Sequence, residues 1–158
     1  MSHTQTIEKT NDLTQDLLKV FQDLDVCIAE QEAIIVEERA AMKAFDAEQL
    51  TALVERRARC QSMQGELEGR CSRLINMSDT PQKMEYFIDR YAANYADDLQ
   101  SMRIDLIRRM QILERDQKEN HIRLRAAWNV TTSILQSIGA IEVNQTYPNT
   151  GYTRQAST

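Results

Sequence analysis

The residues that could carry chemistry are few and poorly placed for it. A di-metal centre in a helical bundle needs Glu-x-x-His pairs facing inward, but the residue three before His121 is Lys118. The acidic pairs Glu37-Glu38 and Asp97-Asp98 are adjacent, so on a helix their side chains point to different sides and cannot share a substrate. Neither a glycine-rich phosphate loop nor a G-x-S-x-G elbow occurs. We therefore predict no catalytic residue, no metal site, no cofactor and a protein that is not an enzyme.

The three cysteines, Cys27, Cys60 and Cys71, are an odd number and form no C-x-x-C motif. Cys60 and Cys71 are separated by about three helical turns and would share one helix side. We interpret all three as small buried hydrophobic residues in a reducing cytosol. A disulfide or a metal role is the alternative.

Apolar residues recur at alternating steps of three and four through three long segments of the chain. That spacing keeps each set on one side of an α-helix, as a narrow stripe that must pack against another helix. We therefore predict an all-α fold: a long antiparallel helical hairpin or coiled coil, a short third helix, a long last helix and a flexible C-terminal tail. The first seam is Leu13, Leu17, Phe21, Leu24, Ile28, Gln31, Ile35, Glu38, Met42 and Phe45; the second is Leu50, Leu53, Arg57, Cys60, Gln64, Leu67, Cys71 and Leu74; the last is Leu99, Met102, Leu106, Met110, Leu113, Gln117, Asn120, Leu124, Ala127, Thr131, Ile134, Ile138 and Ile141.

The connection between the first two helices carries a helix start signal. The first helix is expected over residues 6–45. Asp46, with Gln49 three residues later, predicts a capping box for the second helix, and Phe45 and Leu50 can form a hydrophobic staple around it. Gly65 and Gly69 lie four residues apart inside the second helix, a spacing that favours close approach of another helix.

A break at residues 77–81 separates the hairpin from the rest of the chain. Thr80 as N-cap and Pro81 as first helical residue predict a short third helix over 81–95, which is rich in aromatic residues. Whether this helix folds over the hairpin or merges with the last helix stays open. The last helix should end near residues 139–141. One helical domain, 6–141, and a tail, 142–158, are expected.

Polar residues inside the seams have a structural interpretation. Gln117, Asn120 and His121 interrupt the last seam and predict a polar layer that fixes helix register; a bend or a partner's polar group is the alternative. Arg56, Arg57 and Arg59 form a basic cluster opposite a first helix whose residues 6–45 hold nine acids and four bases. We expect them to form salt bridges there rather than a nucleic-acid surface.

The overall charge and the absence of apolar runs limit the class of partner. The formal net charge is −5, which argues against nucleic acid or an anionic membrane as the main partner. No apolar run approaches the roughly 20 residues that span a bilayer, and the polar first ten residues do not look like a signal peptide. A cytoplasmic protein without membrane insertion is expected.

Several segments in order resemble the flagellar export chaperones of the FlgN type. The stretch from Glu37 to Leu53 is similar to the family's Glu-rich helix end, its D-x-x-x-L-x-x-L start and the basic residues that follow. Glu66 and Arg70 match an E-x-x-x-R pattern. Asn120 precedes apolar residues of the last helix, and Thr146 to Gly151 matches a T-Y-x-x-x-G tail motif.

The resemblance implies a cytosolic chaperone of flagellar type III secretion. It would bind the C-terminal helices of hook–filament junction proteins, prevent their premature assembly and deliver them to the flagellar export apparatus. Tyr147 and Tyr152 in the tail would contact the export gate. A self-associating coiled-coil scaffold or adaptor is the alternative function. The seams are compatible with a monomer and with a homodimer. The expected client surface is Trp128, Ile134, Leu135, Ile138 and Ile141.

Overall fold

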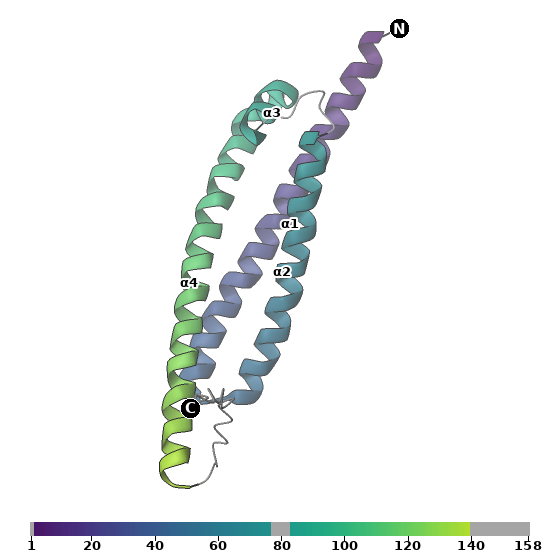
Figure 1. Cartoon of the computed structure of the whole chain (residues 1–158). Helices are drawn as coiled ribbons and strands as arrows, with labels where there is room; N and C mark the ends of the chain where they lie inside the picture. The colour runs from purple at the N-terminus through teal and green to yellow at the C-terminus, as the bar shows by residue number, and fades with distance from the viewer. Residues whose placement is uncertain (1, 77–82, 140–158) are drawn as a thin grey trace, which may run out of the picture. The chain divides into compact units, whose positions relative to one another are not determined.

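The computed structural model describes residues 2–76 and 83–139, which form helices and turns without a strand, so the predicted all-α fold is confirmed. The elements are α1 (Ser2–Ala44), α2 (Ala47–Asn76), α3 (Met84–Tyr91), the single 3-10 turn η1 (Ala93–Tyr95) and α4 (Ala96–Ser137) (Figure 1). The chain divides into two units, Met1–Ile122 and Arg123–Thr158. Helix α4 contributes to both units, which are described in turn.

A tight turn reverses the chain between α1 and α2 in the first unit. Phe45 has a φ of 56°, in the left-handed region. Its N–H donates to Met42 O, and the N–H of Asp46 donates to Ala41 O over 3.0 Å. This is a Schellman motif with phenylalanine at the position that usually holds glycine. Asp46 Oδ1 then accepts from the N–H of Gln49 at 2.9 Å, which confirms the predicted N-cap of α2.

The predicted hydrophobic staple between Phe45 and Leu50 is wrong. Phe45 is 86% exposed, because its left-handed backbone turns the ring away from the hairpin. Leu50 packs instead beside a small apolar cluster of Ile34, Ala41 and Leu53. The staple needs its first residue to approach the new helix, and the Schellman turn prevents that approach.

The first unit has its core along one side of α1, which lies between α2 and the part of α4 up to Ile122 (Figure 1). Since α1 contacts two helices, its buried side is wider than the predicted seam. Four further residues join that seam in the core: Val20, Cys27, Ile34 and Ala41. From α2 the core receives Leu53, Leu67 and Leu74, and from α4 it receives Leu99, Leu106 and Leu113.

Helix α3 is separate from α4 and packs on the hairpin, which answers the question left open by the sequence. Phe87 and Ile88 are fully buried in the same cluster as the core of α1. Thr14 Oγ1 of α1 donates to Tyr91 O over 3.2 Å. The helix begins at Met84, later than the predicted start at Pro81, and Thr80 and Pro81 lie outside the described residues.

Helix α4 runs in the same direction as α1 within the first unit. Arg109 pairs with Glu32, and further along both helices Asn120 pairs with Glu38. Around Asn120 the bonded residues are 81 to 85 positions apart in sequence.

The cysteines lie in the helix interfaces of the first unit as free thiols. Cys27 belongs to the core, and Cys60 and Cys71 pack against it. Burial raises the pKa of the Cys27 and Cys60 thiols and raises that of Cys71 to about 11. The prediction of buried cysteines is therefore confirmed for Cys27, whereas Cys60 and Cys71 are only half-buried. Within the described parts of the chain, no helix is both long and apolar enough to span a bilayer.

Candidate functional site

Three glutamines, one from each long helix, meet in the middle of the first unit. Gln31 of α1 is only 2% exposed. Its Nε2 donates to Gln64 Oε1 of α2 at 2.6 Å, and its Oε1 accepts from Gln117 Nε2 of α4 at 3.1 Å. A buried amide that bonds to both neighbours specifies how the three helices align, because a shift along any axis would break these bonds.

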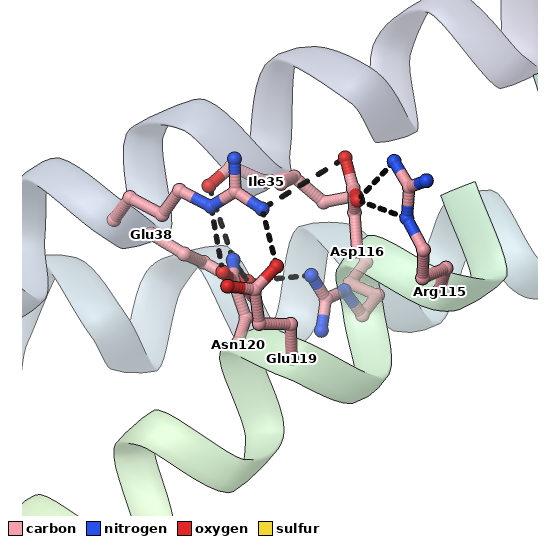
Figure 2. A network of polar contacts seen from close by, with 8 residues as sticks. Ile35, Glu38, Arg115, Asp116, Glu119 and Asn120 are labelled. Carbon is pink, nitrogen blue, oxygen red and sulfur yellow. Dashed lines mark hydrogen bonds and ion pairs between the residues drawn. The ribbon is translucent and has the colours of Figure 1, made fainter. Parts of the chain in front are cut away.

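A second polar layer lies about one heptad further along α1, around Asn120 and Glu38 (Figure 2). Asn120 Nδ2 donates to Ile35 O at 3.1 Å and to the Glu38 carboxylate at 3.0 Å, and Asn120 Oδ1 accepts from Arg39 Nε at 2.9 Å. Arg57 of α2 donates to the same Glu38 oxygen at 2.5 Å. The amide nitrogen and oxygen of Asn120 are thus both engaged, whereas the buried Nε of Arg57 in the same layer has no partner among the described residues.

The predicted polar layer is confirmed for Gln117 and Asn120 but not for His121. His121 is exposed and stays outside both layers. It follows Asn120 directly, so it points about 100° away around the helix. The two layers hold buried amides and one paired carboxylate, a composition suited to fixing register. None of these groups is poised as a nucleophile or general base.

Two arginines clamp acids of α1 along the edges of the interfaces. Arg56 of α2 bonds to Glu30 at 2.5 Å and to Glu37 at 2.9 Å. The hydrogen bond from Arg56 lowers the pKa of the Glu30 carboxyl below its usual range. Arg109 of α4 bonds to Glu32 at 2.9 Å and also to Asp25. The predicted salt bridges to the acidic first helix are therefore confirmed for Arg56 and Arg57. Arg59 is exposed and forms no ion pair with the described residues of α1.

The glycine pair of α2 does not bring another helix close, contrary to the prediction. A Cβ added at Gly65 would meet no atom within 4 Å, and one at Gly69 would meet only the end of the Arg73 side chain. Gly65 instead borders a groove of about 500 Å³ between α2 and α4, with Gln31, Gln64 and Met110 also in its lining. No close helix contact therefore requires either glycine.

The predicted client residues belong to an uncovered apolar stripe in the second unit. Trp128 is 72% exposed and Ile138 is 69% exposed; Ile134 is also exposed, and Leu135 is half-buried. Ile141, Tyr147 and Tyr152 lie outside the described residues. Leu124 belongs to the same predicted seam, outside the predicted client surface, and it too is exposed. We call the set the α4 stripe: Leu124, Ala127, Trp128, Thr131, Ile134, Leu135 and Ile138.

The α4 stripe continues the seam that is buried in the first unit. Steps of three and four lead from Leu99 through Leu113 and Asn120, all buried, to Ile134 and Ile138, both exposed. Helix α4 ends at Ser137, and Gly139 with φ 72° donates its N–H to Gln136 O at 3.0 Å, which closes the last turn. The stripe is thus held on a regular helix in helix-packing geometry.

Helix α1 also has an apolar row on its outer side that the sequence analysis missed. Val26, Ala29, Ala33, Val36 and Ala40 are all exposed and follow the same three-four spacing. The stronger core seam of larger residues on the other side of the helix masked this pattern. Small residues bury little area per side chain, so this row is a weaker candidate surface than the α4 stripe.

The described residues contain no group of three His, Cys, Asp or Glu side chains close enough to hold a metal ion. The exposed side chains of the α4 stripe are apolar except for Thr131. Comparison with known proteins supplies no relative: no protein-family model, curated protein or solved structure matches the chain.

Proposed function

We propose that this protein is a cytosolic chaperone of flagellar type III secretion that binds the C-terminal helices of hook–filament junction proteins. It would keep those subunits from assembling early and deliver them to the export apparatus. The proposal rests on the family resemblance of the sequence. The single structural observation that supports it is the exposure of the α4 seam beyond Asn120.

Exposing an apolar helical stripe to water is unfavourable in free energy, and a partner helix that covers the stripe removes this exposure. Covering one large apolar side chain contributes about 1.5–3 kcal/mol. Trp128, Ile134 and Ile138 are each more than half exposed, so a helix laid along them gains substantially from burial. A secreted subunit that carries its own apolar helix would be protected by the same contact.

The second part of the proposal concerns delivery to the export apparatus. Tyr147 and Tyr152 lie outside the described residues, and their assignment to the export gate rests on the resemblance alone. The change Tyr147→Ala should reduce export of the client while leaving client binding intact. Unchanged export would remove this part of the proposal and leave client binding standing.

The test of client binding compares two charge insertions at equally exposed apolar positions. Ile138→Asp places a carboxylate in the α4 stripe, and Val36→Asp places one in the outer row of α1, where Val36 is 65% exposed. Each variant would be purified with a co-expressed hook–filament junction protein, after circular dichroism has shown that it is folded. We expect Ile138→Asp to lose the co-purifying client and Val36→Asp to keep it.

Two outcomes would overturn the proposal. Stoichiometric recovery of client with folded Ile138→Asp would remove the α4 stripe as the client surface. Failure of the unaltered chain to retain any junction protein, together with a stable oligomer in sedimentation, would favour the self-associating scaffold instead.

A further inference from the structure

We infer that the α4 stripe selects a partner helix by its apolar surface and not by its charge, so that helices with acidic or basic flanks bind about equally well. The inference rests on the proposed function, since it describes how the client surface recognises its client. The occupant is an amphipathic helix with a seam of Leu or Ile residues. Its flanking residues are free to vary.

The first observation is the composition of the positions beside the stripe. From Ala126 to Gly139 the chain has no acidic or basic residue. The positions next to the stripe on the helix surface hold Val130, Thr132 and Ser137. In paired helices, charges at such flanking positions set the choice and orientation of the partner. Here those positions can neither attract nor repel a charged partner.

The second observation is the contrast with the buried interfaces of the first unit. There α1 is clamped to α2 by Arg56 and to α4 by Arg109, each pairing with two acids. The same helix α4 that supplies Arg109 carries no charged residue between Arg125 and Gly139, where most of the exposed stripe lies. The internal interfaces thus combine apolar contact with amide and charge pairs, whereas most of the stripe offers apolar contact alone.

The charges nearest the stripe lie only at its first turn. Arg123 and Arg125 flank Leu124, and as its immediate neighbours they point away from it around the helix. An exposed pair with either would contribute about 0–1 kcal/mol. From Leu124 to Ile138 the stripe spans about 21 Å, so most of a partner helix lies beyond their reach.

The experiment uses the full chain and its only tryptophan, Trp128, as the reporter. Two synthetic amphipathic helices of about 18 residues would share one Leu/Ile seam and carry either glutamate or lysine at the flanking positions. Each would be titrated into the protein while Trp128 emission is followed. At a salt concentration near 0.15 M the Debye length is about 8 Å. This screening suppresses long-range attraction between the acidic protein and the lysine peptide.

We expect both peptides to shift Trp128 emission to shorter wavelength with dissociation constants within about threefold of each other. Neither constant should change by more than about threefold between roughly 0.05 and 0.5 M salt. The variant Ile138→Asp should weaken both peptides equally, and Val36→Asp should weaken neither.

A preference of about tenfold or more for one peptide, or a steep salt dependence, would overturn the inference while leaving the helix-binding function in place. If neither peptide shifts Trp128, the stripe does not bind helices. That result would overturn the proposed function and the inference with it.

Discussion

Asn120 of α4 and Glu38 of α1 are 82 residues apart in sequence and share a hydrogen bond of 3.0 Å inside the bundle. Their side chains are 3% and 6% exposed, so neither can exchange this partner for water. Since Glu38 also pairs with Arg57 of α2, the contact ties all three long helices to one alignment. A buried polar group in this position lowers stability relative to packed apolar residues, but it fixes the helices in one register.

The change Asn120→Ala should destabilise the protein by about 2 kcal/mol, because it removes the buried donor to the Ile35 carbonyl and to Glu38, and the acceptor of Arg39 Nε. Urea unfolding followed by far-ultraviolet circular dichroism would measure the loss. The matched control is Asn129→Ala, which alters an exposed asparagine on the same helix and should not lower stability. Equal stability of the two variants would show that the polar layer is dispensable.

Phe45 should be a site where a smaller residue stabilises the hairpin. A left-handed conformation costs a non-glycine residue about 1–2 kcal/mol. Glycine avoids this strain but loses more conformational entropy on folding, which lowers the free energy of unfolding by roughly 0.5–1 kcal/mol. We therefore expect Phe45→Gly to raise the free energy of unfolding by about 0.5 kcal/mol. Thermal and urea unfolding would measure it. Phe45→Ala removes the ring but keeps the Cβ, and should change little.

A drop in stability for Phe45→Gly larger than for Phe45→Ala would contradict this account of the turn. It would mean that the strain of the left-handed residue is negligible and that backbone freedom in the unfolded chain dominates.

Gly65→Ala should stabilise α2. The position lies inside a regular helix, and an added Cβ meets no atom within 4 Å. Alanine is favoured over glycine in a helix interior by about 0.8–1.0 kcal/mol. A gain of that order in chemical unfolding would confirm that no close helix contact depends on the glycine. A lower free energy of unfolding for Gly65→Ala would indicate that the groove beside Gly65 is filled in solution.

The ion pair between Glu30 and Arg56 should make stability depend on pH in the acidic range. The bond from Arg56 lowers the Glu30 pKa below its ordinary value of 4.5. A carboxylate with a depressed folded pKa contributes stability above the unfolded pKa, and that contribution is lost as pH falls through the folded pKa. The stability difference between the unaltered chain and Glu30→Gln should therefore be constant above about pH 5 and shrink below 4.5.

The control for this prediction is the same comparison in an Arg56→Gln background. Without Arg56 the carboxylate has lost its main partner, so Glu30→Gln should have little effect at any pH. An unchanged pH dependence in that background would assign the effect to another group.

The sequence predicted the helices and their buried sides because the three-four spacing directly encodes a helix surface. Leu17, Leu53 and Leu106 lie in the core as expected. The cap at Asp46 was equally predictable, since its chemistry is local. These features depend on neighbours within one or two turns of helix.

Features that depend on distant partners could not be predicted in this way. The seam of α4 has the same spacing before and after Asn120, yet only the first part is buried. The spacing of a seam does not say which of its residues meet another helix, so the extent of burial along α4 is known only from the fold. The direction of Phe45 and the open space at Gly65 likewise depend on the geometry of the turn and of the groove.

Trp128 provides a direct test of whether the α4 stripe is uncovered in the free protein. It is the only tryptophan of the chain and is 72% exposed. The emission maximum of the native protein should therefore lie near that of tryptophan in water and move little on unfolding, while circular dichroism reports the loss of helix. Acrylamide should quench native and unfolded protein to a similar extent. A native maximum at clearly shorter wavelength would mean that something covers the stripe in solution. Dilution would then identify the cover, because a second copy would be released at low concentration and a segment of the same chain would not.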